Sequence, residues 1–454
     1  MKIIVIGANH AGTSFIRTLK TVNPDVQITA YDRNTNVSFL GCGIAVWVSG
    51  EMKQPDGLFY SSPEILENDY HVNLKTNHEV IKVDTLKKEV TVKDNATGKT
   101  FTDTYDKLVF AGGTWPIEPK IKGIEYNNVV LSKLYQHAQA LVEYANNKNI
   151  KSVAVVGAGY IGTELAEAFR HKGKKVTLID IKDRVIGNYF DKPFTQILET
   201  KMVENGIKLA LNEKVVELKS KNGKDVSSVV TDKGEYAADL VIMCVGFKPR
   251  TDIIDVDKLP NGAIKVNKFQ QSISNNDVYA LGDACALKSN LTNDYDYIAL
   301  ATNAVKTGVV AALSIAGANV PFPGVVGTNA INAFDCHYAS TGFTLESAIE
   351  HNFKNAKSIY FEDYDKPEFM HDAEKVACEI VYDDKTKKLL GAQIGSWGKN
   401  IHTETIYMLA MAIQQGLTLD QIALSDVYFL PHFNKPFNFV LVPILKALGI
   451  DYKY

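Results

Sequence analysis

Apolar residues near the start of the chain form first an unbroken run and then a helical pattern. Residues 2–6 read KIIVI, which is typical of a strand buried on both faces of a parallel sheet. Farther along, apolar residues recur every three or four positions, which predicts a helix with Phe15, Leu19 and Val22 facing inward. A buried strand followed by an amphipathic helix is typical of an α/β fold.

Glycines occupy the turn between this strand and helix. Gly7 permits a tight turn and Gly12 permits close packing of helix on strand, although Asn9 replaces the middle glycine of G-x-G-x-x-G. Asp32 ends the next strand pattern, VQITAYD, at the spacing where a carboxylate reaches a ribose hydroxyl. Because helix N-terminal amides bind pyrophosphate, this unit is a candidate dinucleotide site.

A complete copy of the motif follows in the stretch SVAVVGAGYIGTELAEAF. Gly157, Gly159 and Gly162 lie between a strand and a helix, and Asp180 ends the next strand pattern, KVTLID. A single glycine-rich turn often does no more than connect a strand to a helix. Two copies with strand, turn, helix and acid in the same order predict two dinucleotide sites. The second helix is expected to bury Ile161, Leu165 and Phe169.

A third feature lies at the end of the strand pattern NDVYAL. Gly282 and Asp283 follow it directly, and the stretch YIALATNAVKTGVVAALSIAG then predicts a helix of small residues. An acid at the carboxyl end of a strand is well placed for a ligand, and a helix N-terminus favours an anion. The alternative interpretation is that Asp283 only caps a helix.

The last third of the chain has the pattern of a further unit. The stretches KVACEIVY and KLLGAQIG predict two strands joined by DDKTK. The stretch IHTETIYMLAMAIQQG predicts a helix that ends at Gly416, with Met408 and Met411 in the core. The following TLDQ, at 418–421, fits a capping box.

Composition and charge narrow the class of protein. The 454 residues are 46% hydrophobic and 22% charged, which is ordinary for a globular protein of about three domains. A net charge of −3 provides no basic surface, so no nucleic acid is expected as a partner. The apolar start is too short for a secretory signal and Pro443 interrupts the apolar C-terminal stretch. We expect a soluble, cytoplasmic protein that binds no membrane, and no histidine spacing predicts a metal.

One cysteine lies in an unusual setting. Cys42 stands between two glycines in SFLGCGIAVW, and a helix beginning there would lower the pKa of its thiol. A disulfide with Cys-x4-Cys spacing would need a cysteine where the chain has Trp47. A lone cysteine is most often a small buried hydrophobe. The other cysteines are expected to be reduced core thiols: Cys244, Cys285, Cys336 and Cys378.

The order of these features resembles one protein family. A first glycine-rich turn, Cys42, the complete turn at 157–162 and then Gly282 and Asp283 are arranged as in the FAD-dependent pyridine nucleotide-disulfide oxidoreductases. With Cys42 as the single cysteine of its motif, His10 in the first turn and YFLPHFNKPFN near the end, the chain resembles the single-cysteine branch. The resemblance implies an α/β fold with two Rossmann-like domains and a C-terminal α+β dimerisation domain, in a homodimer. The implied bounds are 1–117 with 249–325 for FAD, 118–248 for NAD(P)H and 326–454 for dimerisation.

The resemblance also implies which residues surround the two dinucleotides. Around FAD it places Gly7, Ala8, Asn9, His10, Ala11, Gly12, Asp32, Cys42, Val80, Ala111, Gly112, Gly113, Lys133, Asp283, Leu300 and Ala301. Around NAD it places Gly157, Gly159, Tyr160, Ile161, Gly162, Asp180, Tyr189, Gly246 and Thr328. Asp180 should repel a 2′-phosphate, although Lys182 softens that repulsion, so NADH is the expected reductant and NADPH a second one.

The reaction that the resemblance implies is NADH oxidation with reduction of O2 to water, with Cys42 and His10 as catalytic residues. A thiolate beside a flavin can be oxidised to a sulfenic acid and restored by two electrons without a second cysteine. His10 at a helix N-terminus is expected to be neutral and to act as acid and base. Hydrogen peroxide and coenzyme A disulfide remain alternative acceptors. A redox-sensing nucleotide binder is the alternative outside enzymes, and it would not turn over NADH repeatedly.

Overall fold

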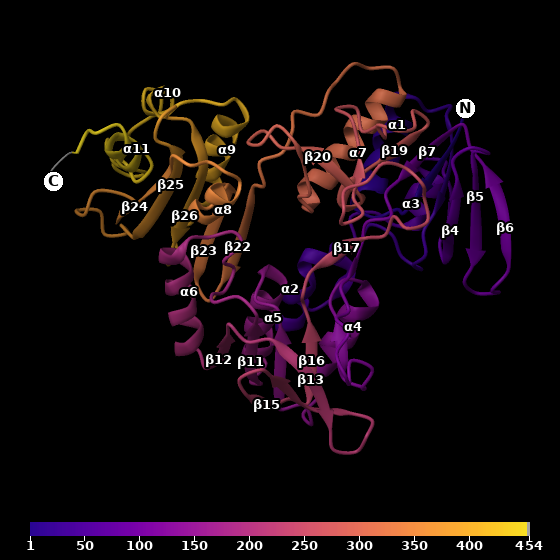
Figure 1. The fold of residues 1–454 in the computed structure, drawn as a ribbon, viewed down its shortest axis with the longest axis horizontal. Coiled ribbons are helices and arrows are strands. Elements are labelled where there is room, and N and C mark those ends of the chain that lie inside the picture. Colours follow the sequence, from indigo (N-terminus) through magenta and orange to yellow (C-terminus); the bar gives the residue numbers. More distant parts are fainter. Residues whose placement is uncertain (452–454) are drawn as a thin grey trace.

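The structure is a computed structural model that describes residues 1–451. Figure 1 shows three large sheets along the molecule, each with its own helices, so the predicted α/β class is confirmed. Within residues 1–451, no helix combines the length and apolar character needed to cross a membrane.

The first sheet is built from two distant parts of the chain. Its strands are parallel and run in the order β19-β7-β1-β2-β3. Helices α1 (His10–Val22) and α7 (Ala301–Ile315) lie together and share one apolar core with the sheet. The strand bounds are Lys2–Ile6 for β1, Gln27–Tyr31 for β2, Asn73–Lys75 for β3, Lys107–Phe110 for β7 and Val278–Ala280 for β19.

The buried face of α1 is shorter than its sequence pattern predicts. Phe15 and Leu19 are fully buried, as expected, but Val22 is 48% exposed, so its predicted inward position is wrong. Val22 is the last residue of α1, and the chain leaves the helix at Asn23. The apolar spacing in the sequence continues to the end of α1, but the core that the helix packs against ends before Val22.

The second sheet repeats the architecture of the first around the complete glycine motif. Its parallel strands run in the order β12-β11-β10-β16-β9, and helix α5 follows β10 directly. The strand bounds are Val129–Leu131 (β9), Ser152–Val156 (β10), Lys175–Asp180 (β11), Ile207–Leu211 (β12) and Leu240–Met243 (β16). The helix bounds are Tyr135–Asn146 (α4), Tyr160–His171 (α5) and Lys192–Glu204 (α6).

Two short strands connect the first and second sheets. β8 (Thr114–Pro116) leads into the second unit, and β17 (Phe247–Pro249) leads out of it. The two strands pair antiparallel, so both connections lie side by side. The domain limits at residues 117/118 and 248/249 stay a prediction beside this pairing.

The third sheet is antiparallel and belongs to the C-terminal part of the chain. Its order is β22-β23-β26-β25-β24, and the two predicted strands are the neighbours β25 and β26. The strand bounds are Asn329–Ala333 (β22), Cys336–Gly342 (β23), Ala356–Tyr364 (β24), Lys375–Asp383 (β25) and Leu389–Ser396 (β26). The helix bounds are Leu345–Glu350 (α8), Ile406–Gln414 (α9), Leu419–Ala423 (α10) and Leu441–Ala447 (α11).

Local predictions in this C-terminal part had mixed outcomes. The capping box is confirmed, since the Thr418 N–H donates to Gln421 Oε1 over 2.9 Å at the start of α10. The core assignment of the two α9 methionines is wrong. Met408 is 37% exposed and Met411 65%, because α9 buries its opposite face, including Leu409, against the sheet.

Smaller elements complete the described chain. Three small sheets have the orders β4-β5-β6, β13-β14-β15 and β18-β20-β21. Their bounds are His78–Asp84, Glu89–Asp94 and Thr100–Thr104; Val215–Ser220, Val226–Thr231 and Glu235–Ala237; and Ile264–Lys265, Cys285–Lys288 and Tyr295–Asp296. Two short helices are α2 (Ile44–Ser49) and α3 (Pro63–Asn68), and 3-10 turns span Gly41–Gly43, Pro55–Leu58, Gly282–Ala284 and Thr403–Thr405.

Candidate active site

A cavity of about 440 Å³ opens at the carboxyl edge of the first sheet. The last residues of its strands, or those just after them, line it, as in other parallel α/β sheets that bind ligands there. Most residues expected around FAD line this cavity: Gly7, Asn9, His10, Ala11, Asp32, Cys42, Val80, Ala111, Gly112, Gly113, Lys133, Asp283 and Ala301. Ala8 and Gly12 are buried beneath the turn, and Leu300 lies half-buried just before α7.

The first turn, residues 7–12, is shaped by Gly7 and Asp32. Gly7 has a φ of +91°, and a Cβ on it would lie 2.4 Å from the Ala111 carbonyl oxygen. The Asp32 carboxylate accepts hydrogen bonds from the N–H groups of Ala8 and Asn34, both over 2.8 Å. Burial raises the pKa of Asp32, and these hydrogen bonds oppose the rise. Asp32 therefore fixes the backbone of the turn and lies at the cavity wall.

The second turn, residues 157–162, has the same construction. Gly157 has a φ of +106°, and a Cβ on it would lie 2.3 Å from the carbonyl oxygen of Cys244. Asp180 accepts from the N–H groups of Ala158, over 2.5 Å, and Lys182, over 2.7 Å. A Cβ on Gly159 would meet no atom within 4 Å, so the turn faces open space of the kind that a phosphate needs.

The remaining residues expected around NAD fall into two places. Tyr160 and Tyr189 stack with ring centroids 4.2 Å apart beside the second turn. Ile161 is half-buried and lines the first cavity, so the two turns approach the same space. Gly246 follows β16 with a φ of +103°. Thr328 instead lines a separate cavity of about 540 Å³ beside α9 and bonds Thr341 over 2.8 Å.

Cys42 lies in the 3-10 turn Gly41–Gly43, directly before α2, and its side chain is exposed to the cavity. The surrounding protein raises the pKa of Cys42 through burial and through the charge of Glu164, while the Lys133 ammonium lowers it. Cys42 therefore does not begin a helix as expected, since α2 starts at Ile44, and the expected lowering of its pKa is wrong for the protein alone because desolvation dominates. Trp47 is 9% exposed and stacks on Tyr135, at a centroid distance of 5.8 Å.

His10 is the first residue of α1 and lines the same cavity as Cys42. Its ring stacks on Tyr60, with centroids 5.3 Å apart and planes within 7°. Burial lowers the pKa of His10, as does the Lys133 charge, while the Asp283 charge raises it. The imidazole is therefore neutral near pH 7, as expected, although burial is the main cause.

A polar network joins the two cavity residues Lys133 and Asp283. Lys133 Nζ donates to Thr114 Oγ1 over 2.8 Å and lies 3.5 Å from Asp283 Oδ2. Thr114 Oγ1 is also 3.3 Å from that carboxylate oxygen. Sequence analysis did not identify Thr114 or Tyr60 as site residues. Thr114 directly follows the glycines 112 and 113, which was a usable signal, whereas Tyr60 lies in a loop without any motif.

Comparison with known proteins gives the family. The family model described as "Pyridine nucleotide-disulphide oxidoreductase" matches residues 1–308, which include both turns, Cys42 and Asp283. The chain belongs to the pyridine nucleotide-disulphide oxidoreductase family. The model of the dimerisation domain of this family matches residues 330–438, which include the third sheet apart from Asn329.

Several members of the family resemble this chain over its full length. An NADH oxidase from Mycoplasma genitalium is 47% identical, over 99% of this chain and 98% of the relative. The solved water-forming NADH oxidase from Lactobacillus brevis, bound to NADH, has a TM-score of 0.95 and 40% identity, over 99% of this chain and 98% of that one. An NAD(P)H coenzyme A polysulfide/persulfide reductase from Pyrococcus horikoshii is 33% identical over 98% of each chain. Members of one family with one fold thus differ in their electron acceptor.

Proposed function

We propose that this protein is an FAD-dependent NADH oxidase that reduces O2 by four electrons to water, with Cys42 as its redox-active thiol. The observation that carries the proposal is the arrangement of the first cavity. A single cysteine and a neutral histidine line the same cavity as the first dinucleotide turn, and no second cysteine among residues 1–451 lines it. The similarity to NADH oxidases at 47% and 40% identity supports this acceptor over disulfide substrates.

The residues of the cavity fit an FAD. Gly7 approaches the Ala111 carbonyl too closely for any side chain, which keeps the turn tight, and a Cβ on Gly113 would meet open space. Asp32 would hold the ribose of FAD, and the N-terminus of α1 would hold its pyrophosphate. Lys133 and Asp283 would hold the end of FAD that lies farthest from this ribose. Bound FAD supplies hydride acceptance from NADH and electron delivery to O2.

In the proposed reaction, the protein's own residues act in the removal of hydrogen peroxide. The Cys42 thiolate attacks one oxygen of hydrogen peroxide, the O–O bond breaks, and the cysteine becomes a sulfenic acid while water leaves. His10, which starts neutral, takes the proton from the Cys42 thiol and then, as imidazolium, gives it to the departing hydroxide to form the water. Two further electrons and two protons return the sulfenic acid to thiol and release a second water. The sum is two NADH, two protons and one O2 giving two NAD⁺ and two water molecules.

Substitution of Cys42 by serine tests this function. In the unmodified enzyme we expect about two NADH per O2 and no accumulated peroxide, measured by NADH absorbance with an oxygen electrode and late addition of catalase. Cys42→Ser should lower the ratio to about one and release peroxide. Cys378→Ala, a buried thiol of the third sheet, is the matched control and should keep the ratio near two. A Cys42→Ser enzyme that still forms only water would exclude Cys42 from the reaction.

We propose further that the enzyme is a cytoplasmic homodimer that prefers NADH as its reductant. The described C-terminal surface exposes apolar side chains, including Tyr407 (62%), Met411 (65%), Leu424 (85%) and Tyr428 (70%), which supports a homodimer formed by residues 326–454. Asp180 supports NADH as the preferred reductant, with NADPH as the second. The free cysteines of the described chain are consistent with a cytoplasmic enzyme.

A further inference from the structure

The connection between β11 and α6, residues 181–191, is held unusually firmly to the second turn. Ile186 in its middle is 2% exposed and has a φ of +47°, a left-handed conformation that β-branched residues rarely adopt. Its N–H donates to the Ala158 carbonyl oxygen over 2.8 Å, and the Ala158 N–H donates to Asp180. A conformation of this kind persists only where surrounding contacts impose it. The 181–191 loop is therefore docked onto the second turn in one defined shape.

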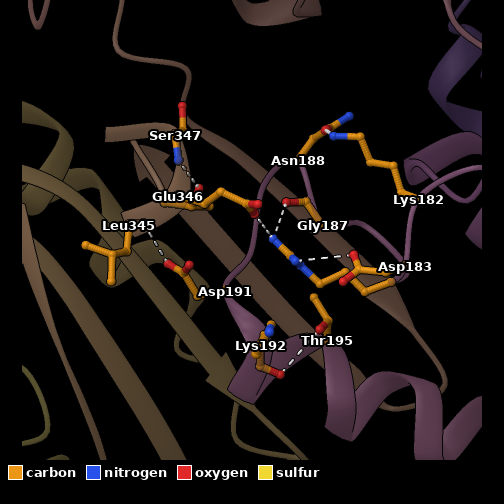
Figure 2. Close-up of polar contacts among 12 residues, drawn as sticks. Lys182, Asp183, Gly187, Asn188, Asp191, Lys192, Thr195, Leu345, Glu346 and Ser347 are labelled. Atoms are coloured by element: carbon orange, nitrogen blue, oxygen red, sulfur yellow. Dashed lines mark hydrogen bonds and ion pairs between the residues drawn. The ribbon is translucent and has the colours of Figure 1, made fainter. Parts of the chain in front are cut away.

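The end of this loop is bound to the C-terminal unit, which we define as residues 326–451. Asp191 directly precedes α6, where an aspartate usually caps the helix, yet its side chain makes no capping bond. Its carboxylate instead accepts from the Leu345 N–H over 3.1 Å and from Gln393 Nε2 over 2.5 Å. The Asp191 N–H in turn donates to Gln393 Oε1 over 2.7 Å. Figure 2 shows Asp191 facing Leu345 from the loop.

A second contact lies at the middle of the loop. The Arg184 side chain is 11% exposed, pairs with Glu346 of α8 and lies 3.4 Å from Asp183. It also donates to the Gly187 carbonyl oxygen over 3.5 Å. Figure 2 shows Asp183, Gly187 and Glu346 gathered around this point. One ion pair, Arg184 with Glu346, therefore joins the middle of the loop to the C-terminal unit.

Aromatic packing makes this interface rigid. Phe190 of the loop and Phe194 of α6 each lie 5.5 Å from the Tyr338 ring of β23, measured between centroids. The Tyr338 hydroxyl donates to the Phe194 carbonyl oxygen over 3.1 Å. Figure 1 shows α6 beside the third sheet. Close-packed contacts of this kind hold one arrangement and do not slide freely.

From these contacts we infer that the C-terminal unit forms part of the NADH site by holding the 181–191 loop, with Asp191 and Gln393 as positioning residues. The inference rests on the proposed function, because it takes the second turn as the NADH site. The loop begins beside Asp180, the ribose acid, and carries Tyr189, which stacks on Tyr160. Because contacts within the chain itself hold the loop, binding of the adenosine half does not have to order it.

The test measures binding of ADP-ribose, which is the ligand without its nicotinamide ring, to the FAD-containing full-length enzyme by titration calorimetry. Asp191→Ala and Gln393→Ala should each weaken ADP-ribose binding about tenfold and raise the KM for NADH by a similar factor, with kcat within twofold. The double variant should be little worse than either single one, because both remove the same contact. Asp191→Asn keeps an acceptor for the Leu345 N–H and should recover part of the affinity.

Two further variants keep the test decisive. Lys357→Ala removes an exposed ion pair with Asp384 in the C-terminal unit, away from the loop, and should leave binding unchanged. If the variants at 191 and 393 do not fold, Glu346→Gln decides, because Glu346 is 60% exposed and should still weaken ADP-ribose binding two- to threefold. Folded variants that bind ADP-ribose as the unmodified enzyme does would overturn the inference. An enzyme that binds ADP-ribose but does not reduce O2 would overturn only the proposed function.

Discussion

A buried carboxyl group next to this interface should make stability depend on pH. Glu379 of β25 is 4% exposed and lies opposite Gln393 in the strand register. Within the described residues its Oε2 has no hydrogen-bond partner. Burial, together with the charge of Asp191, raises the pKa of Glu379 to about 7 from a usual value of 4.5. The folded protein therefore favours the protonated acid.

The sign and size of the effect follow from this shift. Between about pH 4.5 and pH 7 the folded state binds more protons at this site than the unfolded state, so stability falls as the pH rises. The full shift corresponds to about 3 kcal/mol, of which about 2–3 kcal/mol falls between pH 5 and pH 8. Glu379→Gln has no proton to lose and should lack this part of the pH dependence. Relative to the unmodified protein, its free energy of unfolding should rise by that amount across the range.

Urea unfolding at pH 5, 6, 7 and 8, at fixed protein and FAD concentrations, measures the effect. Trp397 is a local fluorescence probe, because its indole N–H donates to the Tyr338 hydroxyl over 2.9 Å at the same interface. Glu350→Gln, at an exposed position of α8, is the control and should follow the unmodified protein at every pH. Parallel stability curves for Glu379→Gln and the unmodified protein would refute the reasoning.

Three other perturbations test the packing, the reductant and the thiol. Gly308→Ala should destabilise by about 1–3 kcal/mol in urea unfolding, because its Cβ would lie 2.6 Å from the Ala11 carbonyl oxygen where α7 crosses α1. Asp180→Ala should raise the ratio of kcat/KM for NADPH to that for NADH by about tenfold, since about 1.4 kcal/mol of repulsion is lost; an unchanged ratio in steady-state assays would contradict this. Lys133→Met should move the pH profile of Cys42 alkylation by iodoacetamide to higher pH. Glu164→Gln should move the part of this profile above pH 7 in the opposite direction, to lower pH, because the two charges shift the Cys42 pKa in opposite directions.

The sequence predicted the parts of the fold that depend on local pattern. Both strand–turn–helix units, the β25–β26 pair and the capping box formed where expected, because each depends on residues close in the chain. The errors at Val22, Met408 and Met411 have a shared cause. A helical apolar stripe shows which face is apolar, but not how far the core beneath it extends or whether another surface covers it.

The candidate site also contains features that the sequence predicted and features that it did not. Glycines and acids of the two turns were predictable, because the backbone geometry there admits few residue types. The stacking of His10 on Tyr60 and the raised pKa of Cys42 were not, since both arise from segments brought together by folding. The contacts of Asp191 were equally hidden. Asp191 occupies the N-cap position of α6, and only the fold places Gln393, 202 positions away, against it.

The paired connections β8 and β17 have a consequence for engineering the molecule. Ile117 N–H donates to the Gly246 carbonyl oxygen over 2.9 Å, so the whole second unit leaves the chain and returns to it at one point. An insert whose ends already meet adds little loop-closure entropy to its host, and such inserts are tolerated in folded proteins. We therefore expect the second unit to be exchangeable between related chains at residues 117 and 246. Its contacts with the C-terminal unit would have to be exchanged with it.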